Sequence, residues 1–345
     1  ALIFKYLGGV DAVPICLDTK DPENIINVAK WLQPSFGGIN LEDLSQPKCF
    51  YILDRLRAEC SIPVWHDDQQ GTATVLLVGL INALKIVGKK LGDVNVTMVG
   101  AGSANIAITR LLHTSGIKPE NTIMVDSKGI LNKGRSDIES RQAEYADKWR
   151  ICQTTNAGNR SGGIAEALRG ADVCIALSRP GPNVIKKEWV ATMAKDAIVF
   201  ACANPIPEIW PWEAKEAGAR IVGTGRSDFP NQLNNSLVFP GLFRGVLDVR
   251  AKTITDEMCI AAALELAKCA EEKGLSEERI APNMDEWEIF PREAVAVGMK
   301  AQELGLAGVK ISADDLYKQA ATTIKRARAI ADDMMKNGHI APIPE

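Results

Sequence analysis

The chain has 345 residues, of which 46% are hydrophobic, and its 40 Lys and Arg against 43 Asp and Glu give a net charge of −3. This is the composition of a globular protein with a sizeable core, and the length suggests about two domains. The net charge argues against a nucleic-acid binder or a polybasic membrane anchor, because both classes need a surplus of basic residues. The chain begins at Ala1, inside an apolar run and without an initiator Met, so we expect its natural start upstream.

Cysteines and apolar runs narrow the class of protein further. The eight cysteines form no C-x-x-C pair and lie within apolar segments, which predicts buried reduced thiols rather than a disulfide framework. The three histidines are too few and too scattered for a His-based metal site. The longest apolar stretch, residues 73–87, is shorter than the ~20 residues of a membrane span, so we expect no membrane partner.

Short helices and strands are expected over the first 70 residues. Strand patterns cover residues 12–17 and 62–65, and helical spacing covers residues 22–32 and 48–59. The second strand pattern runs directly into an acidic stretch, which is followed by an apolar helix.

From residue 74 to about residue 225, strand and helix patterns alternate. Strands are predicted at 94–99, 122–125, 172–177, 197–201 and 220–222, and helices up to His113 and at 164–168, 186–194, 213–217, 256–272 and 313–335. Apolar strands without polar alternation, separated by helices, indicate a parallel sheet covered on both faces. The sequence therefore predicts an α/β fold with a Rossmann-type doubly wound, mainly parallel sheet, a smaller N-terminal region and a helical C-terminal tail.

A dinucleotide-binding turn is expected where Gly100-x-Gly102 lies between a strand and a helix. The first Gly permits the tight turn, and the second lets the backbone approach a pyrophosphate at the helix N-terminus. The third position of the fingerprint holds Asn105 instead of Gly or Ala, so the match is partial. Asp126 ends the next strand, where an acidic residue can hold a ribose 2′-hydroxyl. Together these features favour a cofactor site over a simple tight turn.

Two acidic pairs, Glu42-Asp43 and Asp67-Asp68, each follow a short apolar run. Their carboxylate oxygens are ligands that suit Mg²⁺ or Mn²⁺ better than Zn²⁺. The alternative is a solvated acidic surface. The second pair lies between two apolar elements, and carboxylates packed in this way need partners such as a cation.

Asparagines gather in two later segments. Asn204 leaves the carboxyl end of a predicted strand, the end at which open parallel sheets bind ligands. Residues 231–236 place five polar side chains ahead of an apolar run. Asn side chains can grip a substrate carboxylate or a nicotinamide amide, but Asn is also a common turn residue, and both interpretations stay open here.

Seven motifs lie in order along nearly the whole chain. They are FGGINLED at 36–43, DDQQGTA at 67–73, GAG at 100–102, VDSKG at 125–129, ANP at 203–205, GRSDFPNQLNN at 225–235 and FPGLFRGVLDVR at 239–250. In this combination the sequence resembles the malic enzymes, oxidative decarboxylases of malate, and most of all their compact prokaryotic-type branch.

The resemblance implies a divalent-metal site that holds Mg²⁺ or Mn²⁺. Glu42, Asp43 and Asp68 match the metal ligands of the family, and Asp67 matches the neighbouring acidic residue that orients the site. Trp65 stands where the family usually has Phe, a tolerable exchange of aromatic residues.

The resemblance also implies catalytic and cofactor contacts. Asn204 and Asn234 are expected, with Asp67, among the catalytic residues. The expected cofactor contacts are Gly100, Gly102, Ser103, Asp126, Ser127, Lys128, Asn204 and Asn235. The family's general base Lys is expected one residue upstream of Ala1, with its proton-donating Tyr and a substrate-binding Arg further upstream.

The implied reaction is the oxidative decarboxylation of (S)-malate to pyruvate and CO₂ with reduction of NAD(P)⁺. Asp126 alone points to NAD, because a carboxylate repels a 2′-phosphate. Ser127 and Lys128 offer groups that can receive that phosphate, and the balance leans slightly to NADP. The alternatives are a metal-free 2-hydroxyacid dehydrogenase, for which His66 is the only candidate base, and a non-catalytic dinucleotide-binding fragment.

The remaining expectations concern organisation. Residues 1–72 are expected to be the remnant of an N-terminal substrate and metal domain, 73–300 the NAD(P)-binding domain and 301–345 a helical tail. Malate is the expected small-molecule partner, with no nucleic acid and no membrane, and the resemblance implies a homodimer or higher homo-oligomer. A cytoplasmic location is expected, with an organelle-targeting segment upstream left open.

Overall fold

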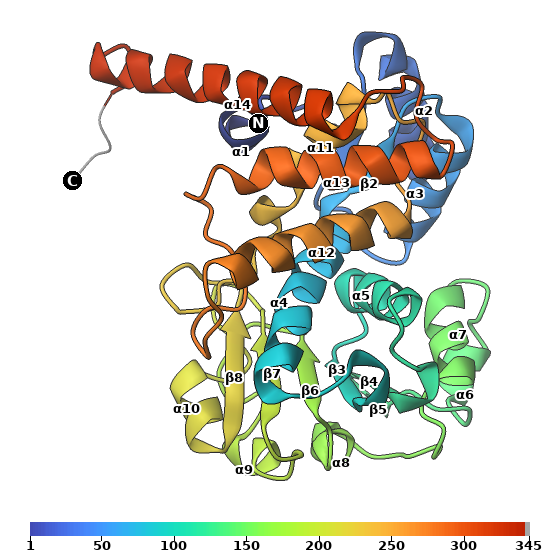
Figure 1. Cartoon of the computed structure of the whole chain (residues 1–345). Coiled ribbons are helices and arrows are strands. Elements are labelled where there is room, and N and C mark those ends of the chain that lie inside the picture. The colour runs from blue at the N-terminus through green and yellow to red at the C-terminus, as the bar shows by residue number, and fades with distance from the viewer. Residues whose placement is uncertain (342–345) are drawn as a thin grey trace.

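A six-stranded sheet forms the centre of the lower half of the molecule in the computed structural model, which describes residues 1–341 (Figure 1). The strand order is β5-β4-β3-β6-β7-β8. Five strands are parallel, namely β3 (Val96–Val99), β4 (Thr122–Asp126), β6 (Val173–Ala176), β7 (Ala197–Ala201) and β8 (Ala219–Thr224), and the short edge strand β5 (Gly129–Ile130) is antiparallel to β4. The predicted doubly wound, mainly parallel sheet is confirmed.

Helices bury both faces of this sheet, which explains why its strands are apolar at successive positions. Met98, Ile175 and Phe200 belong to the main core, together with residues of α4 (Thr72–Val87), α5 (Ser103–Thr114) and α12 (Asp256–Glu272). Residues next to them in the chain, such as Val99 and Cys174, belong to a second core, formed with α8 (Ile164–Leu168), α9 (Lys187–Val190) and α10 (Pro211–Glu216). Successive side chains of a strand point to opposite faces, so both sets must be apolar.

The order of the strands defines where a ligand is expected. From β3 the chain continues outward to β4 on one side and later returns to form β6 on the other side of β3. The carboxyl ends of β3 and β6 therefore meet at a topological switch point, where open α/β sheets bind ligands. The Gly100 turn follows β3 at this point.

The N-terminal part builds a small unit of its own. Strands β1 (Ile39–Leu41) and β2 (Val64–His66) pair in parallel, with Leu41 opposite His66. Helices α2 (Pro22–Leu32) and α3 (Lys48–Glu59) cover them around a separate apolar cluster. Asp21 caps α2 by accepting hydrogen bonds from the backbone N–H groups of Glu23 and Asn24. Both helices lie at the predicted residues.

Helices from the C-terminal third return to the N-terminal part. Helix α11 (Phe239–Asp248) packs against α13 (Ile289–Glu303), which also contacts α12 and α14 (Ala313–Lys336). Helix α14 then runs past α1 (Leu2–Gly8), and its last turns extend beyond the body (Figure 1). The helical C-terminus is confirmed, although residues 342–345 of the predicted tail lie outside the described residues. The domain boundaries stay predictions.

The remaining elements are short. They are α6 (Ser136–Glu139), α7 (Ala146–Thr154), the π-helical turn η2 (Asp67–Gly71) and the 3₁₀ turns η1 (Gln33–Ser35), η3 (Leu91–Asp93), η4 (Pro119–Asn121) and η5 (Asn235–Leu237). Turn η2 passes directly into α4, so the helical path continues from the acidic pair into the core.

Several local predictions were wrong. Residues 12–17 form no strand, because no other described strand pairs with them, and the side chains of Val13 and Ile15 are 63% and 47% exposed. Cys16 in the same segment is exposed, so the prediction of a buried thiol fails there, and Cys60 is only half-buried. Helix α9 is half as long as predicted, while α1, α11 and α13 were not predicted at all.

One stretch, Asp67–Val87, has the length and mean hydropathy (1.5) of a membrane span, and 72% of its apolar window is buried inside the structure. Burial by the protein itself is what a core helix requires, and α4 packs against both α5 and α12.

We predict that Gly245→Ala destabilises the fold by about 1–3 kcal/mol, because overpacking forces the backbone apart. A Cβ at Gly245 on α11 would lie 2.3 Å from the carbonyl oxygen of Ala294 on α13. Urea unfolding measures the change. Gly92→Ala is the control, since a Cβ there meets its nearest atom at 3.5 Å, and we expect a shift below about 0.5 kcal/mol. Equal stability of both variants would contradict the close packing of α11 on α13.

Candidate active site

Two acidic pairs meet at the carboxyl ends of β1 and β2. Glu42 and Asp43 follow β1, and Asp67 and Asp68 follow β2. The parallel pairing brings the two strand ends together, and the backbone N–H of Asp43 donates a hydrogen bond to Oδ2 of Asp68 at 2.9 Å. Partial desolvation and the neighbouring carboxylate of Asp68 raise the pKa of Glu42. The predicted metal ligands are thus gathered in one place.

The donor chemistry of this cluster fits a hard divalent cation. Three carboxylates lie close enough for like charges to act on one another, and a cation would relieve that repulsion. Among residues 1–341, however, no three acidic, His or Cys side chains converge as a formed metal site. The residues suit Mg²⁺ or Mn²⁺, and their side chains would have to close around it.

Asp67 connects the acidic cluster to the second asparagine segment. Its carboxylate accepts hydrogen bonds from the indole N–H of Trp65 at 3.1 Å and from Nδ2 of Asn235. A Cβ on Gly71 would lie 2.1 Å from Oδ1 of Asp67, so only glycine leaves room for the carboxylate. Burial, followed by the carboxylate of Glu42, raises the pKa of Asp67 to about 7. The chain therefore places a buried acid between two segments that lie 168 residues apart.

The predicted asparagine residues lie in different surroundings. Asn234 caps η5, and its Oδ1 accepts from the N–H of Ser236 at 2.9 Å and from its hydroxyl at 2.6 Å. This is the turn chemistry that sequence reasoning weighed against substrate binding. Asn204 is exposed beyond the end of β7, next to Gly225, where a Cβ would lie 3.0 Å from Nδ2 of Asn204.

The Gly100 turn has the geometry that a dinucleotide requires. Gly100 has φ +102°, and a Cβ there would lie 2.5 Å from the carbonyl oxygen of Leu177, so glycine is needed. A Cβ on Gly102 would meet no atom within 4 Å, which leaves open space at the start of α5. Ser103 is the first residue of α5, whose unpaired N–H groups can receive a phosphate.

Asn105 explains why the third glycine of the fingerprint is missing. Its side chain is fully buried, and Nδ2 donates to the carbonyl oxygens of Val99 and Gly100, each at 2.9 Å. The amide therefore ties the start of α5 to the end of β3. A small residue at this position would leave those two carbonyl groups without that donor.

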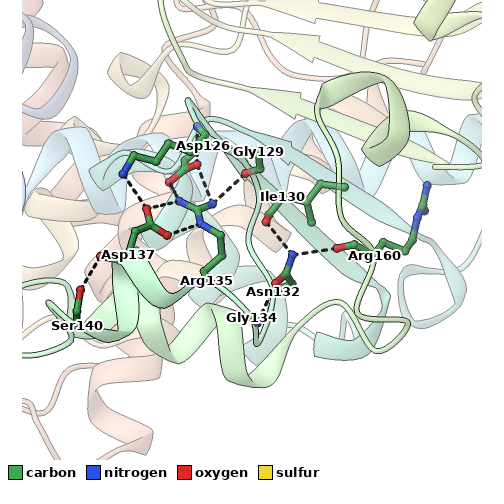
Figure 2. Close-up of polar contacts among 10 residues, drawn as sticks. Asp126, Gly129, Ile130, Asn132, Gly134, Arg135, Asp137, Ser140 and Arg160 are labelled. Carbon is green, nitrogen blue, oxygen red and sulfur yellow. Dashed lines mark hydrogen bonds and ion pairs between the residues drawn. The ribbon is translucent and has the colours of Figure 1, made fainter.

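Asp126 is paired with an arginine that sequence reasoning missed. Both carboxylate oxygens accept from the Arg135 guanidinium at 3.0 and 2.9 Å, and both side chains are 12% exposed (Figure 2). Arg135 also binds Asp137, which in turn accepts from Lys128 at 3.0 Å. These bonds raise the pKa of Arg135 and lower that of Asp137. No local pattern marks Arg135, because it reaches Asp126 only after the chain turns through β5.

The acidic cluster lies next to α5, the helix that follows the dinucleotide turn. Turn η2, which carries Asp67 and Asp68, packs against α5 and against η5. The segment that leads from β8 to η5 stays close to the carboxyl end of β8, because the N–H of Leu233 donates to the carbonyl of Thr224. A groove of about 240 Å³ lies elsewhere, at the amino ends of β3, β4 and β6. The predicted residues therefore follow the carboxyl ends of strands in both sheets: the acidic pairs in the two-stranded sheet and the others in the six-stranded sheet.

His66, the candidate base of the alternative enzyme class, is fully buried. Neither ring nitrogen has a hydrogen-bond partner among the described residues, and Nδ1 lies 3.7 Å from Oδ2 of Asp68. Desolvation lowers the pKa of His66. The histidine belongs to the carboxylate cluster and not to the dinucleotide turn.

Comparison with known proteins decides the family. The family model described as "Malic enzyme, NAD binding domain" matches residues 69–302. The chain belongs to the malic enzyme family. Its relatives include the bifunctional malic/malolactic enzyme of Bacillus subtilis, 45% identical over 323 residues, and the NAD-dependent malic enzyme of Geobacillus stearothermophilus, 49% identical over 307 residues. An NADP-dependent malic enzyme of Rhizobium meliloti is 45% identical over 273 residues.

The family shares the fold described above. The crystal structure of the Entamoeba histolytica malic enzyme superposes with a TM-score of 0.96 at 52% identity, covering 100% of this chain and 72% of that one. The alignments with the Bacillus, Geobacillus and Rhizobium relatives cover 92%, 89% and 79% of this chain. They cover 76%, 62% and 34% of those relatives' own lengths.

We predict that Asn105→Ala destabilises the protein by about 1–3 kcal/mol, because two carbonyl groups lose their buried donor. Binding of NADH or NADPH should weaken as well, since the turn is no longer tied to α5. Urea unfolding and nicotinamide fluorescence measure the two effects. Asn121→Ala is the matched control, because Asn121 is a half-buried residue of η4, before β4 and outside the turn. If Asn105→Ala behaved like this control, the role of the amide would be wrong.

Proposed function

We propose that this chain carries the dinucleotide and metal sites of an enzyme that oxidatively decarboxylates (S)-malate to pyruvate and CO₂, with reduction of NAD(P)⁺. Family membership and the names of the relatives support this reaction. The observation that carries the proposal is the hydrogen bond between Asp67 and Asn235. It joins the acidic cluster at the end of the two-stranded sheet to the segment after β8 of the six-stranded sheet, which also carries the dinucleotide turn.

The acidic and asparagine residues have the following roles in this proposal. Glu42, Asp43 and Asp68 would hold the divalent cation, and Asp67 would fix the strand end that carries Asp68. Asn234 has its Oδ1 engaged in the cap of η5, which leaves its N–H₂ group to donate to a malate carboxylate. Asn204 and Asn235 would orient the nicotinamide end of the cofactor. When bound, the cation supplies a Lewis acid for the C2 oxygen of malate and the dinucleotide accepts the hydride.

The acid–base chemistry needs groups beyond these residues. The general base Lys and the proton-donating Tyr, expected upstream of Ala1, stay predictions. Formation of NADH or NADPH from malate by the full-length protein, with and without Mn²⁺, tests the reaction directly. Turnover without metal would favour the 2-hydroxyacid dehydrogenase alternative, and dinucleotide binding without turnover would favour a non-catalytic role.

We predict that Asp68→Asn in the full-length protein lowers kcat by about 100-fold or more at saturating Mn²⁺, because a neutral amide replaces one of three anionic ligands. Steady-state assay of malate oxidation measures the loss. Asp93→Asn is the control, since Asp93 forms no ion pair among the described residues. Survival of kcat within a few-fold in Asp68→Asn would show that the metal-ligand assignment is wrong.

Cofactor choice depends on the charge beside Asp126. Arg135 neutralises Asp126, so this carboxylate repels a 2′-phosphate less than an unpaired one would. The exposed ammonium of Lys128, 67% accessible, is available to a phosphate even though it also contacts Asp137. These features support the lean to NADP, while relatives are named for both cofactors.

We predict that Lys128→Ala lowers kcat/KM for NADP by about tenfold, the equivalent of one phosphate contact, and leaves kcat/KM for NAD within about twofold. Lys133→Ala, which removes an exposed lysine nearby, should change neither value. Parallel assays with both dinucleotides provide the comparison. A wild-type protein that strongly prefers NAD would refute the lean to NADP.

We further propose a homodimer or higher homo-oligomer that acts in the cytoplasm. Family membership supports self-association, as do exposed apolar side chains along the last turns of α14, namely Ile330, Met334 and Met335. Analytical ultracentrifugation and subcellular fractionation measure the two properties.

A further inference from the structure

Glu208 is a buried carboxylate that the proposed reaction does not use. It lies in the loop between β7 and α10, with no exposed surface. Oε1 accepts hydrogen bonds from the backbone N–H of Ser178 at 2.7 Å and from its hydroxyl at 3.1 Å. Oε2 accepts from the backbone N–H of Ala203 at 3.1 Å. Each of these partners donates, which is what an ionised carboxylate requires.

The two partners belong to two different loops at the carboxyl edge of the sheet. Ser178 follows β6, and Ala203 follows β7, the next strand in the sheet (Figure 1). A single side chain therefore bridges the two loops that leave neighbouring strands, one residue or two beyond their backbone pairing. Charge-assisted hydrogen bonds of this kind are stronger than neutral ones.

Each loop continues into one half of the cofactor site. The loop after β6 packs against the dinucleotide turn, because a Cβ on Gly100 would lie 2.5 Å from the oxygen of Leu177 and 3.1 Å from Cα of Ser178. The N–H of Leu177 also donates to the carbonyl of Val99, at the end of β3. The loop after β7 places Asn204 immediately after Ala203.

We propose that Glu208 is a positioning residue. It holds the dinucleotide turn and the Asn204 segment at the distance from each other that a bound dinucleotide requires. The proposal rests on the proposed function, since it assigns those two segments to one cofactor. Glu208 touches neither substrate nor cofactor and acts through Ser178 and Ala203.

A carboxylate at this position is required by geometry. Glutamine has the same shape, but one of its two terminal groups is an N–H₂ that would face a backbone N–H donor. One loop would lose its acceptor and move away from the other. The backbone N–H of Gly181 still donates to the carbonyl of Ile206, and that of Ile185 to the carbonyl of Glu208. These bonds join the two loops further along the chain, so we expect the variant to fold.

The test compares dinucleotide binding with stability in Glu208→Gln, Ser178→Ala and Glu213→Gln. Titration with NADH and NADPH, followed by nicotinamide fluorescence, gives Kd, and urea unfolding gives stability. We expect Glu208→Gln to raise Kd about tenfold or more. Ser178→Ala removes only the hydroxyl donor and should raise Kd by about two- to fourfold. Glu213→Gln, which alters the neighbouring cap of α10, should leave Kd within twofold.

The following outcomes would overturn the positioning role of Glu208 or the proposed function. A folded Glu208→Gln with Kd within twofold of wild type, even if less stable, overturns the positioning role and leaves a purely structural one. An equal loss of affinity in Glu213→Gln does the same. If Glu208→Gln does not fold, Ser178→Ala decides, and an unchanged Kd there overturns the proposal. A wild-type protein that binds neither dinucleotide overturns the proposed function itself, and this inference with it.

Discussion

The site depends on one buried acid that two distant parts of the chain share. Asp67 accepts from Trp65 beside it and from Asn235, and it occupies space that only a glycine at position 71 leaves free. A buried carboxylate without such donors would cost several kcal/mol, so these contacts are mutually required. They fix the end of β2 against the segment after β8. The acidic cluster is therefore held against the segment after β8 and next to α5, the helix that begins at the dinucleotide turn.

Sequence reasoning recovered the elements whose signals are local. Helices α2, α3, α8 and α12 have the predicted ends, because apolar spacing and polar ends mark them without help from the rest of the chain. Residues 12–17 show the limit of that approach. Their apolar run suits an extended backbone, but whether an extended segment becomes a strand depends on a pairing partner, which the run itself does not reveal. Helices α11 and α13 were missed because glycines at their crossing weaken the helical signal, and tertiary packing supplies the stability.

The site residues also divide into those that a local sequence motif reveals and those that only tertiary contacts reveal. Acidic pairs and glycines at strand ends were visible as sequence motifs, because parallel strands bring their carboxyl ends to one edge. Their partners were not visible. Arg135 neutralises Asp126 from beyond a hairpin, and Glu208, in the loop after β7, reaches back to the start of its own loop and across to the loop after β6. Asn105 looked like a defect in the fingerprint and is instead a hydrogen-bond donor to the turn. Only three-dimensional contacts reveal these compensating residues.

The contact of the last long helix with the first has a consequence for how the chain folds during synthesis. Tyr6 on α1 lies 3.3 Å from a carboxylate oxygen of Asp332, and the Arg328 guanidinium stands 4.2 Å above its ring. Tyr6 and Asp332 are 326 positions apart in the sequence. Helix α1 leaves the ribosome long before α11 and α14 exist, so Phe4 stays exposed until Phe239 and Phe243 of α11 are made, and Tyr6 has no partner until α14 follows. Contacts of such sequence separation slow folding and extend the time during which a nascent chain needs protection from aggregation.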